Sequence, residues 1–191
     1  MKPWKLLSLL LEYPDAALAA AYPDIERAAA GNARIERFLA WQRSLSLAER
    51  QRAYVETFDF DRRASLHLTY HTHGDRRQRG LELVRLKRRY AEAGLTPTAS
   101  ELPDSLPLLL EFADLAPEAG ERLLVELRPS LELVRARLHQ TGSPYALLLD
   151  ALCAALPKPT RAQVAVARRM AAQGPPTELV GLEPLAAGPS R

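Results

Sequence analysis

Apolar residues recur at intervals of three and four along most of this chain, whereas the strict alternation that marks a half-buried strand is missing. Such spacing places apolar side chains on one face of an α-helix. The clearest stripe consists of Leu123, Leu127, Leu131 and Leu138. Pro129 interrupts this stripe. Because proline lacks a backbone N–H and clashes with the preceding turn, we expect two helices or one kinked helix there.

Polar residues that suit helix N-termini recur ahead of apolar stretches. They are Ser46 with Glu49, Asp75 with Gln78, Ser143 followed by Pro144, and Thr160 with Gln163. The second of these predicts a helix ending at Gly94, the third a helix through Leu156, and the fourth a helix ending at Gly174.

Together these signals predict an all-α fold, a single-domain irregular helical bundle with about eight to ten helices across residues 3–173. We expect the Pro-containing stretch from Thr96 to Pro107 to form a mobile loop. Residues 174–191 are rich in Pro, Gly and Ala, and we expect a flexible tail that follows an all-helical domain of residues 1–173.

Composition supports a globular helical protein and narrows its partners. Hydrophobic residues make up 47% of the 191 residues and charged residues 26%, and strong helix formers dominate. The 26 basic residues oppose 23 acidic ones, and this near balance is not typical of a nucleic-acid-binding protein, although the pI is about 9.2. The single cysteine, Cys153, excludes an internal disulfide; we expect a buried, inert thiol, with a reactive thiol as the alternative.

The N-terminal region contains an apolar run that raises the question of a signal peptide. Lys2 and Lys5 precede the run over residues 6–11, but Ser8 interrupts it and Glu12 ends it, so an amphipathic helix is the better interpretation. No stretch approaches the roughly 20 apolar residues that a membrane span needs. We therefore expect a cytoplasmic protein without direct membrane insertion.

Four segments carry more specific information. They read LLLEYPD at 9–15, YVETFD at 54–59 with ASL at 64–66, HTHGDRRQRG at 71–80, and ELPDSLPLLLEF at 101–112. In this order and spacing they resemble the delta-subunit family of respiratory nitrate reductases (the NarJ type), within the wider TorD-like family of molybdoenzyme chaperones. The resemblance runs from about residue 6 to residue 156. Where wider-family members often have histidine after the Pro-Asp pair, this chain has Ser105, so a role of that imidazole is not carried over.

The resemblance implies an all-helical chaperone of the TorD-like type that catalyses nothing and has no cofactor of its own. Such a protein binds the N-terminal segment of the apo catalytic (alpha) subunit of nitrate reductase and prevents early docking on the membrane partner while molybdenum cofactor is inserted. Molybdenum cofactor biosynthesis proteins are further implied partners. The alternative within the family is a chaperone of a dimethyl sulfoxide or trimethylamine N-oxide reductase; the ELPD and HTHG details favour nitrate reductase.

Binding an amphipathic peptide helix requires an apolar groove with a charged rim. The segment from Leu106 to Phe112 offers apolar anchors, and Glu101 and Asp104 offer charges for basic residues of the client. The full set of client-binding candidates is Glu101, Leu102, Pro103, Asp104, Leu106, Pro107, Leu110, Phe112, Tyr54, Phe58, His71 and His73. Tyr54 and Phe58, four residues apart, are also typical of a helix core.

The histidines raise the question of a metal site. His67 and His71 would share a helix face, but a third ligand at typical spacing is missing, so we expect no metal. A metal-dependent helical hydrolase using this cluster with Asp75 and Asp104 stays as the alternative from another class, although one residue separates His73 from Asp75. We expect His71 and His73 to hydrogen-bond to the next helix or to cap the following turn.

Residues 76–89 hold seven basic residues and one acidic residue. Helical spacing directs Arg79 toward the apolar side, and we expect a partly buried ion pair with Glu56 or Asp59.

Three other arginines, Arg85, Arg88 and Arg89, are predicted to point outward. They are interpreted first as a solvated face, then as a contact for the client or another partner, and last as a nucleic-acid surface. Exposed aromatic residues or a recognisable module would favour nucleic acid, and neither is visible. We expect no nucleic-acid partner.

Overall fold

The computed structural model describes residues 2–97, 101–174 and 176, and every extended regular element among them is a helix. The helices are α1 (Trp4–Leu10), α2 (Ala16–Ala20), α3 (Tyr22–Ala29), α4 (Ala33–Arg43), α5 (Leu47–Phe58), the 3-10 helix η1 (Arg62–Ala64), α6 (Tyr70–His73), α7 (Arg77–Glu92), α8 (Leu106–Leu115), α9 (Pro117–Glu126), α10 (Arg128–Gln140), α11 (Ala146–Ala155) and α12 (Arg161–Gln173). The all-α prediction is confirmed. The expected helix number was too low because short helices such as α2 and α6 leave little periodic signal.

Several helix ends follow directly from local sequence. Ser46 and Thr160 each form the reciprocal capping box with the residue three positions later. After the C-terminal end of α7, Gly94 adopts a φ of 76°, a conformation that favours glycine. Its N–H donates to Ala91 O and the next N–H donates to Tyr90 O, the paired bonds of a Schellman cap.

Two predicted helix starts were wrong. α7 begins after Arg76, which makes no side-chain cap, so Asp75 lies outside the helix. α11 begins after Tyr145, because the carbonyls of Ser143 and Pro144 accept hydrogen bonds from Ala146 N and Leu147 N in tight turns that precede the helix. Proline there shapes a turn instead of occupying the first helical position.

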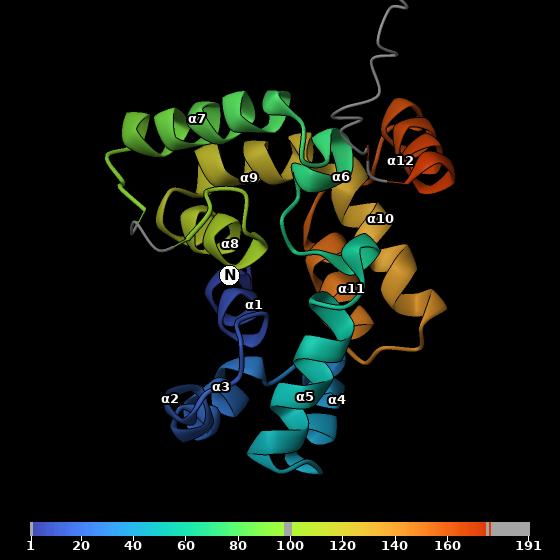
Figure 1. Cartoon of the computed structure of the whole chain (residues 1–191). Coiled ribbons are helices and arrows are strands. Elements are labelled where there is room, and N and C mark those ends of the chain that lie inside the picture. Colours follow the sequence, from blue (N-terminus) through green and yellow to red (C-terminus); the bar gives the residue numbers. More distant parts are fainter. Residues whose placement is uncertain (1, 98–100, 175, 177–191) are drawn as a thin grey trace, which may run out of the picture.

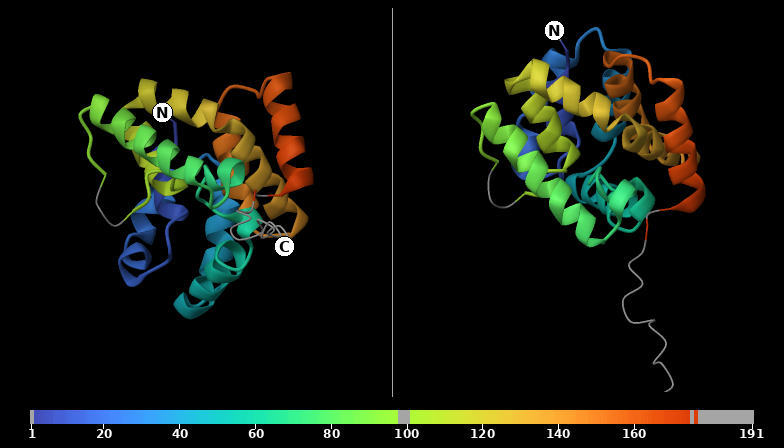
Figure 2. Two further views of the ribbon diagram at one scale, coloured as in Figure 1. Left: turned by 45° about the horizontal axis from the view of Figure 1, so that its top comes forward. Right: turned by 90° about the horizontal axis from the view of Figure 1, so that it is seen from above.

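The helices pack in two groups joined through the core. α1 lies against α8, and α8 against α9, while α11 contacts α4 and α10, and α10 also contacts α12 (Figures 1 and 2). α8 and α11 are the most apolar helices and contribute many of the fully buried side chains, including Leu106, Leu109, Leu110, Leu148, Leu149 and Leu152. These two helices therefore form the centre on which the motif-bearing loops rest.

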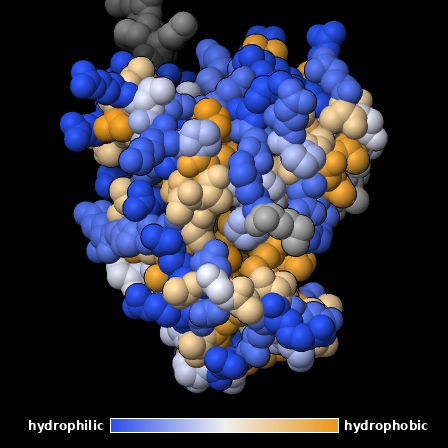
Figure 3. Space-filling view, turned by 180° about the vertical axis from the view of Figure 1, so that it is seen from behind, coloured by the Kyte–Doolittle hydropathy of each residue, from blue (hydrophilic) through white to orange (hydrophobic). Residues whose placement is uncertain are grey.

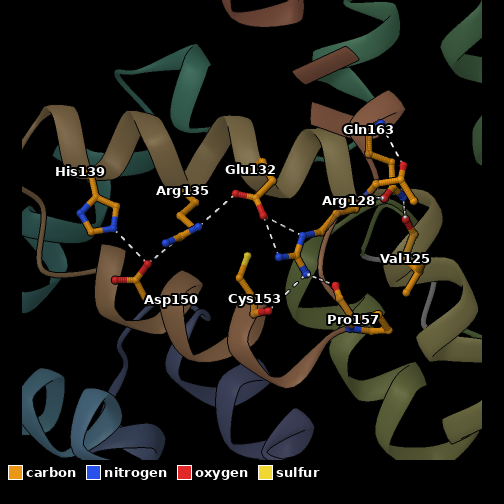
Figure 4. A network of polar contacts seen from close by, with 10 residues as sticks. Val125, Arg128, Glu132, Arg135, His139, Asp150, Cys153, Pro157 and Gln163 are labelled. Atoms are coloured by element: carbon orange, nitrogen blue, oxygen red, sulfur yellow. Dashed lines mark hydrogen bonds and ion pairs between the residues drawn. The ribbon is translucent and has the colours of Figure 1, made fainter. Parts of the chain in front are cut away.

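The stripe around Pro129 is confirmed as two helices, since α9 ends at Glu126 and α10 begins at Arg128. A chain of polar contacts runs along α10 and holds it to its neighbours. Figure 4 shows Glu132 between Arg128 and Arg135, while Arg135 and His139 reach Asp150 of α11. α12 is tied to the end of α9 by a 2.7 Å hydrogen bond from Gln163 Nε2 to Val125 O.

Some predictions fall partly or wholly outside the described residues. Of the loop expected from Thr96 to Pro107, residues 98–100 lie outside the described residues, as do 175 and 177–191 of the expected tail from 174 to 191. Pro107 itself belongs to α8. No helix in the described part of the chain combines the length and the apolar character that crossing a bilayer would require.

Candidate functional site

A fully buried carboxylate lies where two of the sequence segments meet. Asp104 is 0% exposed, and its carboxylate accepts a 2.5 Å hydrogen bond from Thr69 Oγ1 and a 3.1 Å one from Arg79 Nη2. His67 Nδ1 lies 3.3 Å from the same carboxylate. Burial alone would raise the pKa of Asp104, but the bonds from His67 and Thr69 and the charge of Arg79 outweigh it and hold the pKa at about 2. Asp104 is therefore an anion under ordinary conditions.

The backbone around Asp104 is fixed as firmly as its side chain. Leu68 N donates to Asp104 O at 3.0 Å and Leu106 N to Leu66 O at 2.9 Å, which forms a short antiparallel bridge. Tyr90 of α7 donates its hydroxyl to Pro103 O at 2.7 Å. We call this arrangement the Asp104 brace: it joins residues 66–69 to residues 103–106 at the start of α8.

The brace changes the role of most predicted client contacts. The charge of Asp104 is neutralised inside the protein, so Asp104 does not contribute to a charged rim around a client. Its ion-pair partner is Arg79, which corrects the expected pairing of Arg79 with Glu56 or Asp59. The partial burial expected for Arg79 is confirmed, with 17% of its side chain exposed. The other candidates that face the core are Pro103, Leu106, Pro107, Leu110, Phe112, Phe58 and His71. Those on α8 are buried because α8 packs on both α1 and α9, whereas Phe58 packs on Tyr145 and His71 lies against Ser65.

The histidines serve local structure. α6 begins only at Tyr70, so His67 and His71 do not share a helix face. His71 Nε2 lies 2.8 Å from Ser65 O, so its contact is with the preceding loop and not with the next helix as expected. Burial lowers the pKa of His71. His73 ends α6 and is half-buried. Among the described residues no group of three potential ligands is placed to hold a metal ion.

A cavity of about 330 Å³ opens beside the Asp104 brace. It brings together residues of two sequence segments with their flanks: Phe58, Asp59, Arg62, Ser65, His67, Tyr70, Asp75 and Arg79. The Arg79 guanidinium lies 5.7 Å from the centre of the Tyr70 ring, within cation–π range. The wall is therefore mixed, with aromatic surface and charges of both signs.

Aromatic rings lead from the core to the surface next to this cavity. Tyr145, 1% exposed, has its ring centroid 4.9 Å from that of Phe58, and Phe58 lies 4.9 Å from Tyr54. Tyr54 in turn lies 5.6 Å from Tyr13, edge to face, and Tyr13 is 48% exposed. The hydroxyl of Tyr54 donates to Leu11 O at 3.2 Å. The ladder thus presents Tyr13 and part of Tyr54 to solvent on a rigid base.

Carboxylates surround the outer end of this ladder. Partial burial, followed by the charges of Glu101, Glu111 and Asp15, raises the pKa of Glu12. Burial raises the pKa of Tyr54, and the charges of Asp59, Glu12 and Glu101 raise it further. We call Glu12, Tyr13, Tyr54, Asp59 and Glu101 the acidic–aromatic surface. Asp59 also lines the cavity, so surface and cavity are continuous.

Sequence reasoning placed only part of this site. Tyr54 and Glu101 were candidates, and Leu102, at 42% exposed, is also accessible. Glu12 and Tyr13 were not candidates, although both stand in the LLLEYPD segment that contributed to the resemblance. Three further wall residues were missed as site residues, namely Arg62, Ser65 and Tyr70, while Asp75 was considered only for the hydrolase alternative. Tyr70 and Asp75 adjoin or belong to the His-containing segment, which was the available signal.

An all-helical fold in which three of the four segments contribute to the Asp104 brace agrees with the resemblance to molybdoenzyme chaperones. A family model described as nitrate reductase delta subunit matches residues 12–150, a range that contains the Asp104 brace and the acidic–aromatic surface. The chain belongs to the nitrate reductase delta subunit family, which confirms the resemblance found from the sequence segments.

Individual relatives agree. The probable nitrate reductase molybdenum cofactor assembly chaperone NarJ of Bacillus subtilis (strain 168) is 39% identical over 157 residues, which are 78% of this chain and 85% of that protein. The nitrate reductase molybdenum cofactor assembly chaperone NarJ of Escherichia coli (strain K12) is 38% identical over 156 residues, which are 77% of this chain and 66% of that protein. The nitrate reductase-like protein NarX of Mycobacterium tuberculosis (strain H37Rv) is 35% identical over 153 residues, which cover 78% of this chain but 24% of NarX. The first two relatives are named as assembly chaperones, the first of them with the word "probable".

Proposed function

We propose that this protein is an assembly chaperone that binds the N-terminal segment of the apo catalytic subunit of a nitrate reductase and retains that subunit while molybdenum cofactor is inserted. Family membership supports the general role, since relatives at 38–39% identity are named for molybdenum cofactor assembly. The observation that carries the binding step is the acidic–aromatic surface, where exposed Tyr13 packs on Tyr54 among carboxylates.

This surface suits a basic amphipathic helix. Tyr13 and Tyr54 offer ring faces to apolar anchors spaced three and four residues apart, and their packing on the core limits the entropy that binding would cost. Glu12, Asp59 and Glu101 attract Lys or Arg side chains on the flanks of such a helix. Partial burial is the largest cause of the raised pKa of Glu12, and the nearby charges of Glu101, Glu111 and Asp15 raise it further. A cationic segment would relieve the repulsion among these carboxylates. Complementarity therefore favours a positively charged segment as the client.

The Asp104 brace contributes indirectly. Because Pro103 and Asp104 are fixed by Tyr90, Leu68 and Arg79, the preceding Glu101 is held at the protein surface, where its charge influences Glu12 and Tyr54. In this arrangement the buried residues of 103–112 position the exposed residue that meets the client. Asp104 is a positioning residue in this proposal.

The proposal also covers affinity, compartment and further partners. A chaperone must release its client, so a Kd between about 1 μM and tens of nanomolar, or roughly −8 to −10 kcal/mol, is suitable. The free and buried Cys153 fits a reducing compartment, and we place the encounter in the cytoplasm. Molybdenum cofactor biosynthesis proteins are proposed as partners of the complex, and the chain is proposed to hold no cofactor itself.

Isothermal titration of the full chain with a synthetic peptide of the nitrate reductase catalytic subunit's N-terminus tests the function. A scrambled peptide of the same composition is the control. Saturable binding of the native peptide alone supports the proposal. Binding of a dimethyl sulfoxide or trimethylamine N-oxide reductase leader in its place would contradict the proposed client, and binding of neither would contradict the chaperone function.

Charge reversal tests the location. The pair Glu12→Lys with Glu101→Lys should weaken peptide binding by about tenfold or more at low salt, with a smaller effect at high salt. Glu92→Lys with Glu118→Lys makes the same charge change on exposed positions of α7 and α9 and should leave the Kd close to that of the unchanged protein. If both pairs weaken binding equally, the acidic–aromatic surface is not the docking site.

A further inference from the structure

The outer side of α7 is unlike the rest of the protein surface. Helix spacing places one set of side chains along it, which we call the α7 outer face: Arg77, Leu81, Val84, Arg85 and Arg88. Leu81 is 67% exposed and Val84 is 66% exposed, which makes them two of the most exposed large apolar side chains in the described residues. Basic residues thus flank an apolar centre on a single helix face.

The inner side of α7 is fully used by the fold. Leu86 and Tyr90 are buried, and Arg79 reaches the Asp104 brace. Arg89, which was expected to point outward, instead forms a bidentate pair with Glu126 of α9 at 2.7 and 3.0 Å. Figures 1 and 2 show α7 at the margin of the molecule, with α8 and α9 on one side only. The α7 outer face therefore has no packing role in the described structure.

The charges on this face are weakly satisfied. Arg85 lies 3.7 Å from Glu82 and Arg88 lies 3.5 Å from Glu92, both pairs within α7 and largely solvated. Exposed pairs of this kind contribute little to stability. Within the ranges that the structure describes, Arg77 takes part in no ion pair. The arginines are thus available to carboxylates of another molecule.

Gly80 adds an independent indication. A glycine inside an exposed helix costs about 1 kcal/mol relative to alanine. A Cβ at Gly80 would meet nothing within 4 Å, so the protein's own packing does not require glycine there. A residue without a side chain beside Leu81 and Val84 lets the backbone of a partner approach closely.

We propose that the α7 outer face is a second docking surface, which binds an acidic amphipathic helix of a protein partner. Leu81 and Val84 would contact its apolar stripe beside Gly80, and Arg77, Arg85 and Arg88 would pair with its carboxylates. The client proposed for the acidic–aromatic surface is basic, so the same segment does not suit both places. This inference goes beyond the proposed client binding and stands independently of it.

The residue types favour a protein over other anionic partners. An interfacial membrane helix usually carries Trp, Phe and several Leu residues, and this face has two aliphatic side chains of moderate size. Surfaces that bind single-stranded nucleic acid add stacking aromatic residues to their cations, and none stands on this face. Exposed apolar residues also occur away from the α7 outer face. Figure 3, which views the molecule from behind, shows apolar residues across a hollowed middle, with hydrophilic residues over most of the surrounding surface. Those apolar residues need not belong to the α7 outer face.

The test uses the full chain and a defined probe. A designed helical peptide with Leu at positions i, i+3 and i+7 and Glu on the flanks is compared with a peptide of identical composition whose Leu and Glu positions are scrambled. Fluorescence anisotropy should give at least about tenfold tighter binding of the amphipathic peptide. Leu81→Ser with Val84→Ser should weaken its binding by about fivefold or more, and Arg85→Glu with Arg88→Glu by a larger, salt-dependent factor.

Control variants separate this surface from the client site. Glu12→Lys with Glu101→Lys should not weaken binding of the acidic peptide, and circular dichroism of each variant should match the unchanged protein because all altered side chains are exposed. Gly80→Gln should weaken binding by obstructing close approach. Equal binding of both peptides would overturn the proposal. Phosphatidylglycerol vesicles or an oligonucleotide would also overturn it if their binding were weakened more by the Leu81 and Val84 substitutions than peptide binding is.

Discussion

Arg79 of α7 and Asp104, 25 residues later, meet with Nη2 and Oδ2 3.1 Å apart at a position where the carboxylate has no contact with solvent. This pair joins the His-containing segment to the segment that begins α8. Thr69 and His67 complete the set of groups around the carboxylate. The arrangement explains why an arginine stands on the apolar side of a strongly basic helix.

Arg79→Ala should destabilise the fold by about 3–5 kcal/mol, because a buried carboxylate would lose its counter-charge. Urea unfolding followed by circular dichroism measures the change. Arg88→Ala is the matched control on the same helix: its side chain is 82% exposed, and its loss should shift the free energy of unfolding by no more than about 0.5 kcal/mol. Equal unfolding midpoints for Arg79→Ala and the unchanged protein would contradict the role given to the ion pair.

Asp104 should make stability depend on pH in the acid range. Its pKa in the folded protein is about 2, below the value of 3.8 for an unperturbed aspartate. A lowered folded pKa gives a stabilisation that is present above the unfolded pKa and is lost as the pH falls toward the folded one. The difference corresponds to about 2 kcal/mol.

Urea unfolding between about pH 6 and about pH 3 measures this dependence. The unchanged protein should lose stability more steeply than Asp104→Asn, which cannot titrate at this position. Asp24→Asn alters an exposed aspartate and should keep the slope of the unchanged protein. Identical slopes for all three proteins would show that Asp104 does not titrate as described.

Local sequence signals predicted local structure well. The caps at Ser46 and Thr160 and the glycine at Gly94 were found because each is recognised within a few residues of chain. Ser143 and Pro144 failed because the same residues also suit a tight turn, and the choice depends on how Tyr145 packs against Phe58 and Phe38.

The candidate site was harder to predict because it depends on contacts between distant segments. Nothing near Asp104 in the sequence shows that residues 66–68 pair with 104–106, so a charged residue next to Pro103 was interpreted as a surface group. For the same reason Tyr13 was overlooked: its neighbour Tyr54 lies far along the chain. The family resemblance identified the right segments without showing which of their side chains face solvent.

Two glycines should respond in opposite ways to alanine. Gly120 of α9 crosses α8 so closely that a Cβ would lie 2.7 Å from the backbone nitrogen of Ala113. Gly120→Ala should therefore cost about 1–3 kcal/mol through overpacking, despite the better helix propensity of alanine. Gly80→Ala has open space and should stabilise by up to about 1 kcal/mol. Thermal unfolding of both variants measures this, and a stabilised Gly120→Ala would contradict the close crossing.

Cys153 should be inert toward thiol reagents in the folded protein. It is 7% exposed, and burial raises the pKa of its thiol to about 11, so little thiolate forms near neutral pH. Reaction with Ellman's reagent should be slow in buffer and should become complete within minutes in strong denaturant. Rapid, stoichiometric reaction of the native protein would support the reactive-thiol alternative that the sequence left open.

Arg128 should be irreplaceable even by lysine, because it bridges the ends of two helices inside the protein. With 5% of its side chain exposed, it pairs with Glu132 at 2.7 Å and donates to Cys153 O at 3.3 Å and to Pro157 O at 3.2 Å (Figure 4). A lysine keeps the charge, but its compact ammonium group cannot reproduce the planar fork that serves the carboxylate and both carbonyls at once. Arg128→Lys should therefore cost about 1–3 kcal/mol for buried acceptors left without donors.

Hydrogen exchange distinguishes that loss from a general weakening. Amides at the end of α11 and in the connection to α12 should exchange faster in Arg128→Lys, since the carbonyls that the guanidinium holds belong to this stretch. Arg135→Lys, at a position 37% exposed on the same helix, should change the exchange pattern far less. If the two variants show the same exchange and the same free energy of unfolding, the guanidinium of Arg128 does not fix the end of α11, and the packing of α12 on α10 with its hydrogen bond to the end of α9 holds α12 in place.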